Sequence, residues 1–135
     1  MIYDTCLMTQ LDNLVLLLVV FIGGGMGAVL RWSIYTAILK KFHHIFPVGT
    51  FIINISGSFL IGVIFTLALY DNYQLLNLFL ITGLLGGYTT FSTYELETAQ
   101  IFKKNKSVAI IYWLGSVTAG IIVACAGVFL AGGFA

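Results

Sequence analysis

Long apolar stretches separated by short polar ones divide this chain into four segments. The apolar stretches cover residues 14–39, 47–70, 75–101 and 108–133. Each reaches or exceeds the ~20 residues that a helix needs to cross a bilayer. The polar connections between them lie at residues 40–44, 71–74 and 103–107. The pattern predicts one all-α domain over residues 1–135, an integral membrane protein with four transmembrane helices.

The starts of the first two helices carry their own signals. Residues 1–13 contain Asp4 and Asp12 but no lysine or arginine. The positive region of a cleaved signal peptide is therefore missing, and we expect the first segment to be retained as a span. The only proline, Pro47, stands where the second helix is expected to begin, which suits a first-turn position.

Composition and charge support a membrane protein and suggest its orientation. The chain is 60% hydrophobic and 8% charged, against roughly 25% charged residues in a soluble domain. A formal net charge of +1 provides no basic surface for nucleic acid. Connections one and three carry all five lysines, which are Lys40, Lys41, Lys103, Lys104 and Lys106. The positive-inside rule therefore predicts that these two connections are cytoplasmic and that both termini face outward.

The third apolar segment contains a stretch of polar residues and glycines that a simple membrane anchor would not need. Residues 82–95 hold three glycines, Gly83, Gly86 and Gly87, together with five Thr/Ser hydroxyls and two tyrosines. The glycines predict an interrupted helix in the middle of the membrane, where protein or water must satisfy the freed carbonyls. Carbonyl oxygens and hydroxyls are what a site for a small ion or polar solute needs inside a bilayer.

Aromatic and acidic residues follow the predicted interruption. Phe91 and Tyr94 are three residues apart, so we expect both rings on one side of the helix, flanked by Ser92 and Thr93. Ring edges are weakly electropositive and can touch an anion, although two aromatics at this spacing are also typical of a core. Glu95 and Glu97 close the segment, and a position near water explains at least one of them.

Polar stripes mark the second and fourth segments. Thr50, Asn54 and Ser58 recur at four-residue spacing on one helix face, and Tyr112 and Ser116 repeat this spacing, with Gly120 next in the series. The Asn54 amide needs partners, which it finds either as a bond between helices or as part of a pore lining. Tyr112 is also compatible with an ordinary tyrosine at a membrane interface.

The first segment carries small residues and one cation. Gly23, Gly27 and Arg31 share a face, and small residues at this spacing allow another helix to approach closely. We therefore expect a helix interface there. Arg31 lies about two turns before Lys40. It either extends to the membrane surface or has a buried structural or anion-attracting role.

Several function classes can be compared on these residues. The sequence lacks a nucleophile with a base, a metal cluster and a phosphate-binding loop, which argues against an enzyme. A proton-coupled exporter of cationic drugs needs a carboxylate within the membrane, and segments one, two and four contain none. A non-conducting assembly protein, whose polar stripes serve helix packing, is a further alternative to a channel.

Three motifs in this order resemble those of the Fluc (CrcB) family of fluoride channels. They are Gly-Gly-Gly-Met-Gly-Ala-Val-Leu-Arg at 23–31, Gly-Thr-Phe-Ile-Ile-Asn-Ile-Ser-Gly-Ser-Phe at 49–59, and Gly-Gly-Tyr-Thr-Thr-Phe-Ser-Thr-Tyr at 86–94, followed by Glu97. The similarity covers nearly the whole chain after residue 14, and the third motif is highly specific. It implies passive fluoride export, hence fluoride resistance, by a multi-pass protein of the inner (plasma) membrane.

The resemblance also implies an assembly and roles for particular residues. Two subunits would pack antiparallel and enclose two narrow pores, with carbonyls of Gly86 and Thr89 from both holding a structural sodium ion. Asn54 would face the permeating ion, and Phe91 and Tyr94 would offer ring edges to it. The remaining pathway residues would be Thr50, Tyr112, Ser116, Ser92 and Thr93, with Arg31 at a wide vestibule.

This chain departs from the family pattern at two positions. Tyr94 stands where phenylalanine is usual, so its added hydroxyl would either donate to fluoride or alter the ladder of sites. Gly120 stands where a serine often continues the polar track. The lysine bias also bears on assembly, because an antiparallel homodimer requires one chain to insert both ways. The partner is therefore a second copy or an oppositely oriented sister chain, and we favour the second copy.

Overall fold

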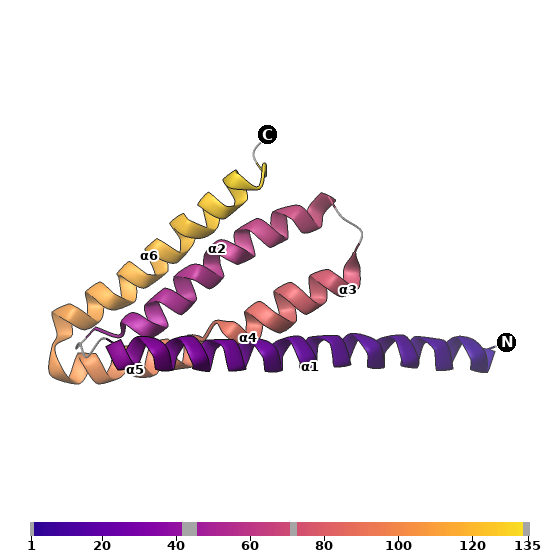
Figure 1. Cartoon of the computed structure of the whole chain (residues 1–135), viewed down its shortest axis with the longest axis horizontal. Helices are drawn as coiled ribbons and strands as arrows, with labels where there is room; N and C mark the ends of the chain where they lie inside the picture. Colours follow the sequence, from indigo (N-terminus) through magenta and orange to yellow (C-terminus); the bar gives the residue numbers. More distant parts are fainter. Residues whose placement is uncertain (1, 42–45, 71–72, 134–135) are drawn as a thin grey trace.

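The computed structural model describes residues 2–41, 46–70 and 73–133, and every regular element in this part of the chain is a helix (Figure 1). Its elements are α1 (Ile2–Lys41), α2 (Val48–Tyr70), α3 (Gln74–Asn77), the π-helical η1 (Leu78–Leu85), α4 (Gly86–Tyr88), α5 (Phe91–Lys104) and α6 (Lys106–Leu130). Four stretches are long and apolar enough to cross a membrane: Asn13–Lys41, Val48–Ala68, Gln74–Lys104 and Lys106–Leu130. The prediction of four spans is confirmed.

The helix ends differ from the predicted ones at two places. Helix α1 begins at Ile2 and has 40 residues, which makes it about 60 Å long, twice the ~30 Å of hydrocarbon. The predicted polar connection at 103–107 is wrong, because Lys103 and Lys104 form the last turn of α5 and only Asn105 separates α5 from α6. Asn105 accepts a hydrogen bond from the Val108 N–H (3.2 Å) and so caps α6.

The helices form two layers that meet at one end of the molecule. Helices α2 and α6 lie side by side, α1 lies along η1 and α4, and α5 packs on α6 (Figure 1). The lysine-bearing ends of α1, α5 and α6 come together at the end opposite the two termini. Because charged amines avoid the hydrocarbon, this lysine-bearing end is the part of the bundle that lies at one membrane–water interface.

Glycines bring α1 into backbone contact with the third span, as the small-residue spacing predicts. A Cβ added at Gly23 would lie 2.7 Å from the carbonyl oxygen of Phe79. At Gly27 it would overlap the Leu84 carbonyl, and at Gly87 the Gly24 carbonyl. Gly83 and Gly87 of the third span therefore serve close packing against α1, and the chain stays helical through them. The interruption comes later, at Thr89 and Thr90.

This packing yields a stability prediction with a matched control two residues away. Gly27→Ala is expected to destabilise the fold by about 2 kcal/mol, because the methyl group meets backbone that cannot move aside. The Cβ added in Gly25→Ala meets no atom within 4 Å in the part of the chain that the structure describes, so this variant should be neutral or stabilise by about 0.5–1 kcal/mol. The measurement is the midpoint temperature for loss of the monodisperse species in detergent. Equal midpoints for both variants would contradict the close contact.

Candidate functional site

Asn54 holds the interruption of the third span in place. Its Nδ2 donates to the Thr90 carbonyl and its Oδ1 accepts from the Thr90 N–H, both at 2.9 Å. Thr90 is extended, with φ −145° and ψ 120°. In an uninterrupted helix the Thr90 N–H would bond to the Gly86 carbonyl. Asn54 therefore bonds α2 to the break, replaces a helical hydrogen bond and leaves the Gly86 carbonyl available to another partner.

Threonine side chains finish the helices on both sides of the break. The Thr89 hydroxyl and N–H both donate to the Leu85 carbonyl, at 2.9 and 3.0 Å, and close α4. The Thr90 hydroxyl accepts from the Thr93 N–H at 3.2 Å and donates to the Thr93 hydroxyl at 3.0 Å, so it caps α5. Ser92 lies 3.4 Å from the Thr90 hydroxyl and is exposed. Hydroxyls and amides thus supply the bonds that the break removes.

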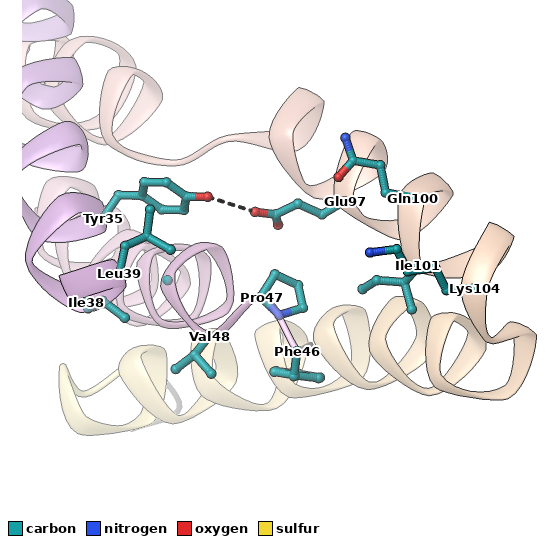
Figure 2. Close-up of a pocket in the computed structure, with 11 residues that line it drawn as sticks. Tyr35, Ile38, Leu39, Phe46, Pro47, Val48, Glu97, Gln100, Ile101 and Lys104 are labelled. Atoms are coloured by element: carbon teal, nitrogen blue, oxygen red, sulfur yellow. Dashed lines mark hydrogen bonds between the residues drawn. The ribbon is translucent and has the colours of Figure 1, made fainter. Parts of the chain in front are cut away.

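Glu97 lies inside the bundle and accepts hydrogen bonds from three other helices. Thr50 of α2 donates at 2.8 Å, Tyr112 of α6 at 3.1 Å and Tyr35 of α1 at 3.4 Å, the last drawn in Figure 2. Thr50 and Tyr112 are 0% and 1% exposed. Glu97 is half-buried and precedes the end of α5 at Lys104 by about 10 Å of helix. A position near water for at least one of Glu95 and Glu97 stays a prediction.

The polar stripes contained a signal for this cluster. Thr50 and Tyr112 begin the stripes of the second and fourth spans, and both lie toward the lysine-bearing end. Two hydroxyls buried at one level need an acceptor, and an ionised carboxylate accepts only. Glu97 is the candidate that this argument would have selected from the third span.

The two rings after the break occupy different environments. The rings of Phe91 and Tyr94 are neighbours, with centroids 6.1 Å apart, but Phe91 is 74% exposed and Tyr94 only 5%. Tyr94 packs on Tyr112 at 5.2 Å, and its hydroxyl donates to the Trp113 carbonyl at 2.6 Å. A three-residue step leaves two side chains about 60° apart around the helix axis, so the rings are neighbours although one is exposed and the other packs inward. The hydroxyl proton of Tyr94 is therefore already used in a hydrogen bond to α6 of the same subunit.

The two remaining positions of the fourth-span stripe differ, and Gly120 faces α2. A Cβ at Gly120 would lie 3.4 Å from the Ser58 hydroxyl. The Ser116 hydroxyl is buried and has no hydrogen-bond partner among the residues that the structure describes. Ser116 is thus a buried donor whose proton remains available.

Two hollows flank the break. One, of about 270 Å³, brings Arg31 together with Thr50, Thr90 and Thr93. The other, of about 230 Å³, is lined by Asn54, Ser58, Thr89 and Phe91 among others. Arg31 is half-buried and so contributes its charge beside the hydroxyls. The arrangement offers hydroxyl and amide donors, an aromatic edge and one cation, which suits a small anion better than a cation.

Comparison with known proteins gives similar sequences over most of the chain. A protein of Yersinia pseudotuberculosis serotype I (strain IP32953), named fluoride-specific ion channel FluC 2, is 43% identical over 115 residues, covering 82% of this chain and 91% of its own length. One of Brucella abortus biovar 1 (strain 9-941), also named fluoride-specific ion channel FluC 2, is 41% identical over 129 residues, covering 92% and 97%.

A third relative, from Ruminiclostridium cellulolyticum (strain ATCC 35319 / DSM 5812 / JCM 6584 / H10), is named fluoride-specific ion channel FluC. It is 50% identical over 88 residues, covering 64% of this chain and 68% of its own length. The family model described as "CrcB-like protein, Camphor Resistance (CrcB)" matches residues 18–128, which include the break and most or all of each span. On this match and these identities, the chain belongs to the CrcB-like family.

Proposed function

We propose that this protein is a fluoride-selective channel that lets cytoplasmic fluoride leave passively, down its electrochemical gradient. Its relatives carry the name fluoride-specific ion channel, and it is a multi-pass membrane protein rather than an enzyme. The observation that carries the proposal is the pairing of Asn54 with the Thr90 backbone. This pairing builds a polar break inside the membrane, beside exposed Phe91 and buried hydroxyls.

Passive flow suffices for export. Fluoride enters cells from acidic surroundings as neutral HF, which crosses lipid and dissociates in a near-neutral cytoplasm. An inside-negative potential then drives the anion outward with ~2.3 kcal/mol per charge per 100 mV. The protein has to replace a tight hydration shell, and a narrow route lined with donors does this best for the smallest halide.

The donors proposed for this route are those whose protons the fold leaves available. Asn54 has a second Nδ2 proton besides the one given to Thr90, and the buried Ser116 hydroxyl is unpartnered within the described part of the chain. Phe91 adds its ring edge. The hydroxyls of Thr50 and Tyr112 donate hydrogen bonds to Glu97, so the carboxylate fixes the orientation of these two pathway residues. In Tyr94 the ring, rather than the committed hydroxyl, is the group that can face the ion.

The exposed face around the break supports an antiparallel dimer. Thr82, Gly86, Phe91 and Ser92 are all exposed on the third span, and polar groups at this depth need protein partners. The Thr90 N–H bonds to Asn54 rather than to the Gly86 carbonyl, which supports a sodium site made by carbonyls of Gly86 and Thr89 from two subunits. A monovalent cation there would supply the positive charge that several converging carbonyl oxygens require. The second subunit is another copy or an oppositely oriented sister chain.

The deciding experiment is efflux of fluoride and chloride from liposomes that contain this chain alone. We expect fluoride to leave at least about tenfold faster than chloride, a difference of ~1.4 kcal/mol or more. Equal rates for the two halides would reject the selectivity. Efflux that appears only after a sister chain is added would support the channel and identify a heterodimer.

A further inference from the structure

A third hollow opens beside Glu97 at the lysine-bearing end of the bundle (Figure 2). It measures about 250 Å³ and lies between the end of α1, the start of α2 and one face of α5. Its polar lining consists of Tyr35, Glu97, Gln100 and Lys104. The hydroxyl of Tyr35 and the carboxylate of Glu97 meet at its inner side (Figure 2).

One face of α5 connects the Glu97 cluster with the end of the bundle. Glu97, Gln100 and Lys104 follow one another at spacings of three and four residues, which places them on the same helix face. Figure 2 shows the amine of Lys104 turned back toward the hollow. Lys103 precedes it by one residue, about 100° around the helix, and does not line the hollow.

The hollow is lined by one negative and one positive side chain, Glu97 and Lys104, which act on an anion in opposite ways. The Glu97 carboxylate repels fluoride, and its three hydroxyl partners direct their protons at the carboxylate rather than into the hollow. Lys104 is the cation among the lining residues. A negative charge at the inner side of the route slows an approaching anion. A positive charge at the mouth offsets this effect, because it raises the local concentration of the anion.

We propose that this hollow is a mouth of the conduction route and that Lys104 collects small hydrated monovalent anions there, with the Gln100 amide as a neutral donor on the way to Glu97. The proposal rests on the function inferred above and adds a collection site to it. Lys104 acts by its position, since Lys103 carries the same charge on the same turn.

The test compares Lys104→Gln with Lys103→Gln. The two substitutions remove the same charge from adjacent positions of α5. Efflux from liposomes is measured at low fluoride, where capture of the ion limits the rate, and at two ionic strengths set with impermeant ions. At about 0.01 M the Debye length is ~30 Å, and Lys104→Gln should lower the rate about two- to fivefold. At about 1 M the Debye length is ~3 Å, and the deficit should disappear.

Lys103→Gln serves as the control and is expected to stay near the wild-type rate at both ionic strengths. Lys104→Glu should lower the low-salt rate further, because it reverses the charge at the mouth. Equal losses in both glutamine variants would overturn the proposal in favour of a general surface potential, and an unchanged Lys104→Gln rate would overturn it outright. A wild-type protein without any fluoride efflux would reject the function itself, which separates the two failures.

Discussion

Fluoride efflux is expected to fall by at least about 100-fold when Asn54 is replaced by alanine. The substitution removes both partners of the Thr90 backbone, whose N–H and carbonyl bond to the amide at 2.9 Å. An unpaired buried backbone group costs about 1–3 kcal/mol, so two of them cost enough to displace the break or the ion route. It also removes a donor proposed for the ion. The measurement is the initial rate of fluoride efflux per reconstituted channel.

A threonine that faces away from the break provides the control. Thr118 is exposed on α6 and donates to the Leu114 carbonyl of its own helix at 2.8 Å, so Thr118→Val should leave the rate within about twofold. A pure assembly protein makes a different prediction for Asn54→Ala: fewer dimers, with unchanged flux through those that remain. Normal flux per dimer in Asn54→Ala would therefore contradict the proposed role of this residue.

Glu97→Gln is expected to lower fluoride efflux about tenfold. The carboxylate accepts from three hydroxyls, using Oε1 for Thr50 and Tyr35 and Oε2 for Tyr112. An amide of the same shape keeps one acceptor oxygen and places two donors at the other position. At least one buried hydroxyl then faces a donor instead of an acceptor, which costs about 1–3 kcal/mol. That hydroxyl is expected to rotate away and so to change the orientation of the polar pathway residues. Fluoride efflux from liposomes measures the loss.

Glu95 provides a matched carboxylate two residues earlier on the same helix. It accepts from the Trp113 indole N–H at 3.3 Å, and a glutamine oxygen can keep that single bond. Glu95→Gln should therefore retain flux within about twofold of wild type. An equal loss in both variants would show that charge on α5, rather than the cluster, matters.

The same pair of variants separates the channel from a proton-coupled drug exporter. The half-buried position of Glu97 within the third span gives such an exporter the membrane carboxylate that it needs. It would lose resistance to cationic drugs in Glu97→Gln, while passive fluoride efflux would be unaffected. The channel predicts the reverse pattern, with the fluoride rate lowered and drug tolerance unchanged.

Most of the fold could be predicted from the sequence because the membrane leaves few choices. Apolar segments of sufficient length have to become helices, since lipid satisfies no backbone hydrogen bond. The spacing of Gly23 and Gly27 similarly indicated a helix interface on α1, and the structure identifies the third span as the neighbour. The glycines of the third span were harder to interpret, because a glycine can either break a helix or admit a neighbour. Here Gly83 and Gly87 admit α1.

The amino-acid sequence by itself determined the four spans, the helix contact at the small residues, and the family to which the motifs belong. Only the tertiary structure decided where the third span breaks and what the polar residues do there. Asn54 and Thr90 are 36 positions apart, and Glu97 draws its donors from three separate helices. Periodicity reports which face of a helix a residue occupies. Whether a polar group on that face meets a backbone, a carboxylate or an ion depends on which helices pack against it.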